Sequence, residues 1–189
     1  MADVFRTNFD YIKKWEGKLS KDPRDPASKF PVPDGSGYHT NMGVTWQAFK
    51  AHFPSLGVHE FYAMPEKVWL TIYREGYWNA VKGDWIDSQI IAEFMADWAW
   101  GSGAYYPSVA LQKYLNSQGY TCIVDGQIGR VTVGLLNQIC KAKGEKAVFD
   151  ALYSARTSFL QSIKGFAVYG VGWMNRMRSF KEYALTVLK

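Results

Sequence analysis

The chain has 189 residues, of which 48% are hydrophobic and 16% aromatic, so it can build a substantial core as one domain or two small ones. Its formal charge of +5 is not gathered in a run of Lys and Arg, and it has no nucleic-acid-binding motif. The charge therefore favours loose attraction to an anionic polymer such as a bacterial cell wall over binding of nucleic acid. No apolar stretch is long enough to insert into a membrane.

Apolar residues that recur three or four positions apart predict three helices in the first half of the chain. The first covers residues 4–15 and places four large apolar side chains on one face. The second begins after Thr45, a good N-cap, and runs to His52. The third begins at Pro65, which suits the first turn of a helix.

Five further helices are expected in the second half of the chain. Three begin at Ser88, near Ser108 and at the N-cap Thr132, and the last two cover residues 145–163 and 173–188. Among these, the segment 145–163 is expected to be the longest.

Only residues 19–21 and 38–42 have an extended pattern, which predicts one small hairpin. The fold class is therefore all-α, or α+β at most with that single hairpin. A boundary is expected after residue 86, between regions 1–86 and 87–189 that pack together as one compact unit.

Glu93 and Asp97 lie one turn apart on the strongly apolar helix that starts at Ser88. A buried carboxylate without a partner is costly. We therefore expect these groups to pair with Arg156 or Arg176, or one of them to line a cleft.

Glu16 follows the first apolar helix in the sequence Trp15-Glu16-Gly17, and a polar, Gly-rich turn lies downstream at residues 34–45. An acid that protonates a glycosidic oxygen must keep its proton near neutral pH. Low polarity beside Trp15 and the partial negative charge of a helix C-terminus both oppose ionisation of Glu16. Glu16 is therefore the candidate general acid of a sugar-cleaving enzyme.

Other common chemistries lack their motifs. The three histidines and two cysteines have no zinc-binding spacing, and no Gly-rich phosphate loop occurs, so no metal or cofactor is expected. Neither Cys122 nor Cys140 lies in a nucleophile motif; the two are either a disulfide or buried free thiols.

The first half of the chain resembles glycoside hydrolase family 108 through three motifs: Trp15-Glu16-Gly17, Asp22-Pro23-Arg24-Asp25-Pro26, and the turn from Gly35 to Thr45. The second half resembles the peptidoglycan-binding region of that family through four: Asp97 with Gly101, Leu111-Gln112, Asp125 to Thr132, and Gly172-Trp173-x-Asn175-Arg176. The sequence departs from the family pattern at Lys18, in the additional segment 27–33, and at Trp100.

Members of this family are lysozyme-like muramidases, often encoded by phages or prophages, and some are described as secretion activators. The resemblance implies a helical lysozyme-like fold and hydrolysis of the bond between N-acetylmuramic acid and N-acetylglucosamine, with Glu16 as the catalytic acid. It also implies that residues 1–86 form the catalytic region and residues 87–189 the peptidoglycan-binding region.

The sequence Asp34-x2-Gly37-Tyr38-x-Thr40 also resembles a turn of the phage-type lysozymes, in which a Glu, an Asp and a Thr form the catalytic set. By this similarity, Asp34 stabilises an oxocarbenium ion or orients the attacking water together with Thr40. Asp25 is the alternative second carboxylate. Glu16 acting without a partner, as in lytic transglycosylases, is a third alternative.

Residues expected to contact the sugar are those that stack on rings or donate hydrogen bonds near the turn. They are Tyr38, Asn41, Trp46, Trp78 and Trp100.

We therefore predict an endolysin-like N-acetylmuramidase whose partner is the glycan strand of bacterial peptidoglycan. Residues 1–6 lack the charged start and apolar run of a secretory signal, so we expect a cytoplasmic protein that reaches the wall through a holin-type pore or on lysis. The alternative is a non-catalytic wall-binding or secretion-assisting protein with the same fold. A chitinase or a transglycosylase is an alternative within the enzyme class.

Overall fold

The structure is a computed structural model that describes residues 1–188. The chain forms two compact units, one of residues 8–74 and one of residues 1–7 together with 75–188. We call them the hairpin unit and the helical unit. The expected boundary after residue 86 falls inside the helical unit, because residues 75–86 and the N-terminal segment belong to it.

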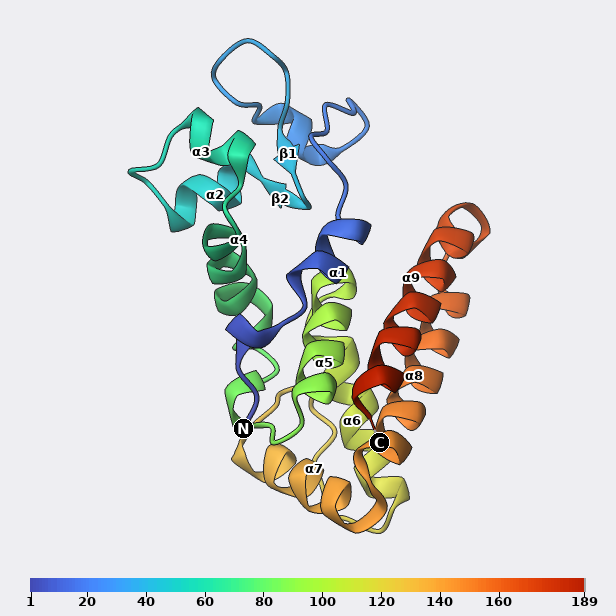
Figure 1. Cartoon of the computed structure of the whole chain (residues 1–189). Coiled ribbons are helices and arrows are strands. Elements are labelled where there is room, and N and C mark those ends of the chain that lie inside the picture. The colour runs from blue at the N-terminus through green and yellow to red at the C-terminus, as the bar shows by residue number, and fades with distance from the viewer. Residues whose placement is uncertain (189) are drawn as a thin grey trace. The chain divides into compact units, whose positions relative to one another are not determined.

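The hairpin unit contains four short helices and a two-stranded antiparallel sheet (Figure 1). In chain order these are α1 (Phe9–Trp15), β1 (Thr40–Asn41), β2 (Val44–Thr45), α2 (Trp46–His52), α3 (Val58–Ala63) and α4 (Glu66–Tyr73). Aromatic rings fill its core: the Phe49 and Phe61 centroids lie 5.4 Å apart, and those of Phe9 and Trp69 lie 5.6 Å apart.

A two-residue turn joins β1 to β2 and fixes their register. Met42 and Gly43 both have positive φ, 48° and 76°, which is the geometry of a type I′ hairpin turn. Met42 adopts this unfavourable conformation where its carbonyl accepts a hydrogen bond of 2.9 Å from the Trp69 indole. The turn pairs Asn41 with Val44 and Thr40 with Thr45.

The helical unit contains five longer helices, with α5 at its centre. They are α5 (Gln89–Ser102), α6 (Tyr105–Ser117), α7 (Arg130–Lys143), α8 (Glu145–Ser162) and α9 (Phe166–Val187). In Figure 1, α8 and α9 run side by side in opposite directions, joined by a short connection. Every residue of α5 from Ile90 to Ala99 is buried, so this helix is the centre of the core.

Two carboxylates of α5 are buried in that core, and both have partners, as predicted for Asp97. Arg156 of α8 donates to Asp97 Oδ2 at 2.7 Å, and Arg176 of α9 donates to Oδ1 at 2.5 Å. Glu93 accepts from the Gln89 amide at 2.7 Å and from the Tyr183 hydroxyl at 3.0 Å. These bonds join α5 to α8 and α9 through polar groups.

The N-terminal segment is part of the helical unit. The Ala2 N–H donates to Ile86 O at 2.7 Å, and Asp3 exchanges two backbone-to-side-chain hydrogen bonds with Gln89. Val4 is fully buried and begins a 3-10 helix that covers Val4–Arg6.

The predicted fold class is confirmed, but several helix bounds differ. The first α-helix starts at Phe9, not at residue 4, because the Asn8 side chain caps it by accepting from the Tyr11 N–H. The helix α3 was not predicted. The last helix was expected to start at residue 173, whereas α9 starts at Phe166 and is longer than α8.

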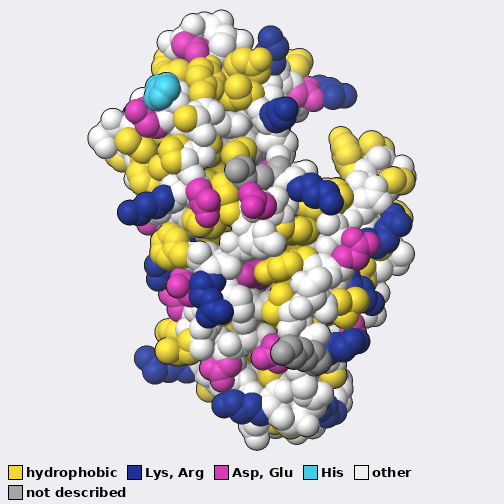
Figure 2. Space-filling model, in the orientation of Figure 1, with side chains coloured by type: hydrophobic (Ala, Val, Ile, Leu, Met, Phe, Trp, Pro, Cys, Tyr) yellow, Lys and Arg dark blue, Asp and Glu magenta, His cyan; other side chains and the backbone are white. Residues whose placement is uncertain are grey.

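Two features concern the molecular surface. Within residues 1–188, no helix combines the length and hydropathy needed to cross a bilayer. On the face drawn in Figure 2, Lys and Arg side chains are interspersed with Asp and Glu.

Candidate active site

Glu16 is placed by the end of α1. Its backbone N–H donates to Ile12 O at 2.9 Å and closes the last turn, after which its own backbone is extended with ψ near 122°. Phe9 and Ile12 are buried and anchor the helix, while the Glu16 side chain is half-buried. The carboxyl group is thus attached to a fixed helix end.

The chain shortly after Glu16 pairs with β1. Ser20, four residues on, donates its N–H to Thr40 O at 2.8 Å and accepts from the His39 N–H at 3.0 Å. This bridge extends the hairpin by one short antiparallel pairing. Backbone hydrogen bonds therefore tie Ser20, four residues after Glu16, to His39 and Thr40.

The Thr40 hydroxyl is oriented by a buried histidine. His39 Nε2 lies 3.2 Å from the Asp22 carbonyl, which only accepts, so Nε2 carries the hydrogen in the neutral ring. His39 Nδ1, 2.9 Å from Thr40 Oγ1, then accepts the hydroxyl hydrogen. The lone pairs of the Thr40 oxygen remain available to accept from another donor, such as water.

Asp34 lies in a loop that a backbone hydrogen bond closes. The Val32 N–H donates to Tyr38 O at 2.7 Å across the loop, and Gly35 and Gly37 supply positive φ values of 78° and 76°. Asp34 Oδ1 accepts from the Ser36 N–H at 2.9 Å, and Oδ2 accepts from the Tyr62 hydroxyl at 2.5 Å.

These bonds favour the ionised form of the Asp34 side chain. Hydrogen bonds from Ser36 and then Tyr62 lower the pKa of Asp34 to about 2. At neutral pH this carboxyl is ionised, so it can stabilise positive charge or accept a proton, but it cannot act as an acid.

Tyr38 and Asn41 flank Thr40 and have different surroundings. Tyr38 is half-buried, its ring 6.2 Å from that of Tyr62 and 5.3 Å from Lys21 Nζ. Asn41 is buried, and its amide donates to Phe61 O at 2.7 Å and Tyr62 O at 3.1 Å. Asn41 thus holds β1 against the end of α3, whereas Tyr38 keeps part of its ring exposed.

The three tryptophans expected at the site lie in three different surroundings. Trp46 is half-buried at the start of α2 and stacks on Phe49 at 5.7 Å. Trp78 is fully buried, and its indole donates to Asp84 at 2.7 Å. A fully buried ring offers no face to a sugar, so we assign Trp78 to the core and not to a cleft wall.

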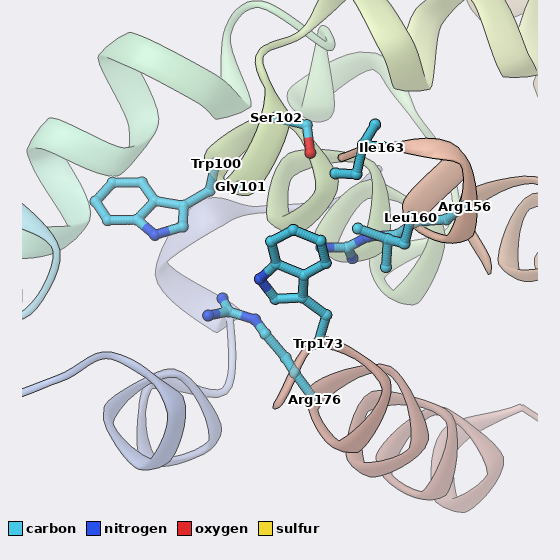
Figure 3. Close-up of a pocket in the computed structure, with 8 residues that line it drawn as sticks. All are labelled: Trp100, Gly101, Ser102, Arg156, Leu160, Ile163, Trp173 and Arg176. Atoms are coloured by element: carbon cyan, nitrogen blue, oxygen red, sulfur yellow. The ribbon is translucent and has the colours of Figure 1, made fainter. Parts of the chain in front are cut away.

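Trp100 lines a cavity of about 210 Å³ in the helical unit (Figure 3). It is half-buried, and its ring lies 4.8 Å from that of Tyr77. In the close-up, Trp173 and Arg176 project from α9 into the same cavity.

Comparison with known proteins identifies the family. A model of the family described as glycosyl hydrolase 108 matches residues 9–103, half of the chain. This chain belongs to the glycosyl hydrolase 108 family. The solved structure of Brucella abortus SagA is similar at 26% identity with a TM-score of 0.68, covering 94% of this chain and 91% of SagA. Among curated proteins, none matches the chain.

The predicted family is thus confirmed, and with it the broad class of glycoside hydrolase. The match to the glycosyl hydrolase 108 model covers Glu16, the loop with Asp34, and Thr40. It ends at Gly103, the C-cap of α5, so α6 to α9 lie outside it.

Within this glycosyl hydrolase 108 chain, the alternative carboxylate Asp25 has a local contact. It caps the 3-10 helix Pro26–Lys29 by accepting from the Ala27 N–H at 2.9 Å. Asp34 is instead held by a residue of another element, which requires a specific tertiary fold.

Tyr62 and His39 are polar neighbours of the site that the sequence analysis did not single out for this role. Tyr62 lies 28 residues after Asp34 on the missed helix α3, so no local pattern indicates the pair. His39 was considered only as a metal ligand, although its position next to Thr40 was a usable signal.

The cysteines take the second of the two alternatives. Cys122 and Cys140 are buried free thiols. Burial raises the pKa of Cys140 to about 12, so its thiolate is scarce at neutral pH. Among residues 1–188, no three His, Cys, Asp or Glu side chains gather as metal ligands would.

Proposed function

We propose that this protein is an N-acetylmuramidase that cleaves the glycan strand of peptidoglycan, with Glu16 as the general acid. The observation that carries the proposal is the position of Glu16. This half-buried residue caps the end of α1 four residues before Ser20, and the Ser20 backbone is hydrogen-bonded to Thr40. Membership of the glycosyl hydrolase 108 family supports the reaction class.

In this mechanism Glu16 donates its proton to the glycosidic oxygen as the bond to the muramic acid carbon breaks. Ionised Asp34 stabilises the positive charge that develops on the sugar ring, or accepts the proton of water. Thr40 accepts a hydrogen bond from that water, because its own hydrogen is engaged by His39.

The remaining residues have supporting parts in this proposal. Tyr38 and Trp46 offer partly exposed rings for sugar contact, and Asn41 fixes the strand. Peptidoglycan is the proposed partner, reached by a holin-type route.

Clearing of purified peptidoglycan by wild type and Glu16→Gln, with mass spectrometry of the products, tests the proposal. We expect reducing muropeptides from wild type and a loss of roughly 10²- to 10⁴-fold in the variant, the range of general acid catalysis. Glu66→Gln is the matched control, since Glu66 is exposed in the same unit. It should retain activity.

Three results would redirect the proposal. Anhydro-muramic products would indicate a transglycosylase. Wall binding without cleavage by wild type would favour the secretion-assisting alternative. Full activity of folded Glu16→Gln would remove Glu16 from the mechanism.

A further inference from the structure

The charged side chains that line the cavity of about 210 Å³ in the helical unit are all positive. Arg156 and Arg176 line it, and no Asp or Glu is among its lining residues. Trp100, Trp173 and Leu160 supply apolar wall, and Ser102 a hydroxyl (Figure 3). Two guanidinium groups beside indole rings form a surface that suits an anion with a small apolar part.

Both guanidinium groups are held in place by the carboxylate of Asp97. Burial alone would raise the pKa of Asp97, but attraction to Arg176 and Arg156 outweighs it and lowers the pKa to about 2. The ionised carboxylate bonds Arg156 at 2.7 Å and Arg176 at 2.5 Å. The orientation of the two forks is thus fixed before any ligand arrives, which reduces the entropy lost on binding.

Arg156 adds a donor that has no acceptor. Its side chain is 6% exposed, and its Nε–H is buried without a hydrogen-bond partner among the described residues. A buried donor left unsatisfied is costly.

The tryptophan of α9 packs closely at Gly165. A Cβ on Gly165 would lie 2.7 Å from the Trp173 ring, so the absence of a side chain at Gly165 makes room for that ring. The ring also contacts Tyr169, with centroids 5.8 Å apart, and gives the cavity an apolar wall.

We propose that this cavity binds a carboxylate of the peptide stem of peptidoglycan. The inference rests on the proposed function, which supplies the substrate class. In a glycan strand that carries its stems, the lactyl carboxyls are consumed in amide bonds, so the carboxylates belong to the stem peptides. The volume suits a single carboxylate-bearing residue rather than a sugar chain.

The sharpest test changes the ligand and leaves the protein intact. Calorimetric titration of wild type compares N-acetylmuramyl-L-alanyl-D-glutamate, with both carboxylates free, with the same compound amidated at both. We expect the free acid to bind at least about tenfold tighter, since hydrogen bonds to charged groups are stronger than those to neutral groups. Equal affinity for the two compounds would overturn the proposal.

Variants then locate the site. Arg176→Lys keeps the positive charge near Asp97 but removes the planar fork, so the affinity ratio of acid to amide should fall severalfold. Arg178→Lys is the control, because Arg178 is exposed on the same helix and bonds Asn175. The ratio is measured within each protein, so a partly unfolded variant does not imitate the effect. An unchanged ratio in Arg176→Lys would place the carboxylate elsewhere and contradict the proposal.

Cleavage of stem-free glycan strands separates the two proposals. If wild type cuts them but does not distinguish acid from amide, the carboxylate site fails and the muramidase stands. If it distinguishes acid from amide but cuts no strand, the carboxylate site stands and the muramidase fails.

Discussion

At the scale of single residues, the hydroxyl of Tyr62 acts together with Ser36 to lower the pKa of Asp34. It donates to Asp34 Oδ2 at 2.5 Å and lies 2.9 Å from the Ser36 hydroxyl. Because the folded pKa of Asp34 is depressed, its contribution to stability is present above about pH 4 and is lost as pH falls toward 2.

Tyr62→Phe should therefore raise the pKa of Asp34 from about 2 toward the ordinary value for Asp, as one of its donors is removed. A carboxyl-resolved NMR titration measures this. Tyr38→Phe keeps the neighbouring ring and leaves Tyr62 in place, and it should leave the pKa of Asp34 low. An equal rise in both variants would show that the hydroxyl of Tyr62 is not the cause.

The candidate site residues differ in how well the sequence predicts them. Glu16, Asp34 and Thr40 were proposed from their types and spacing, and the structure supplies their neighbours without testing their roles. Tyr62 was not predicted as a site residue, because its contact with Asp34 depends on the tertiary position of α3. Trp78 was expected in a cleft wall, because the sequence does not distinguish a buried indole that donates to Asp84 from an indole that lines a cleft.

At the scale of elements, α5 combines nearly complete burial with two carboxylates. Asp97 joins three helices through Arg156 and Arg176, whereas Glu93 has only neutral donors, Gln89 and Tyr183, among its hydrogen-bond partners here. The two carboxylates therefore respond to substitution and to pH in opposite ways.

Asp97→Asn should lower the free energy of unfolding by about 3–5 kcal/mol, because it leaves buried guanidinium charge without its carboxylate. Denaturant titration measures this. Asp150→Asn is the control: Asp150 pairs with Lys146 on the surface of α8 and should cost about 0–1 kcal/mol. A similar small loss in both would show that the Asp97 pairs add nothing.

Glu93→Gln should make the free energy of unfolding depend less on pH. Burial raises the pKa of Glu93 to about 7, against the hydrogen bonds of Gln89 and Tyr183 and the attraction of Arg6, with Asp97 adding repulsion. Between about pH 4.5 and 7, Glu93 is ionised in the unfolded chain but still protonated in the folded one. The free energy of unfolding of wild type therefore falls by roughly 1.4 kcal/mol per pH unit as pH rises.

The variant has no such proton to lose, so its curve should be flatter and should lie above that of wild type at pH 8. Urea unfolding at several pH values measures both curves. Parallel curves for the two proteins would mean that Glu93 ionises normally.

The bounds of these elements show why sequence patterns stop short. The last helix was predicted to start at residue 173, yet α9 begins at Phe166 and runs through Gly170 and Gly172. A Cβ at Gly170 would lie 2.8 Å from the Phe166 ring, so this glycine admits a close contact within the helix. The helix α3 was missed because its six residues give little periodicity to detect.

At the scale of the whole molecule, the chain crosses between the units twice. Residues 1–7 belong to the helical unit, residues 8–74 form the hairpin unit, and the chain then returns. The sequence contains no flexible linker at either crossing, so it gives no signal for a boundary at these positions.

Val4→Ala tests how firmly the N-terminal segment belongs to the helical unit. Val4 is fully buried, so truncation should lower the free energy of unfolding by about 1–3 kcal/mol. Val168→Ala is the control, since Val168 is 75% exposed and should cost almost nothing. A thermal or urea transition unchanged by Val4→Ala would mean that residues 1–7 are only loosely attached.

The hydrogen bonds between Asp3 and Gln89 span 86 residues of sequence, and this separation has a consequence for biosynthesis. At translation rates of about 5–20 residues per second, residues 1–7 leave the ribosome roughly 4–17 s before Gln89 does. All of residues 8–74 emerge in that interval. The hairpin unit can therefore form on the nascent chain while the N-terminal segment still waits for its partner.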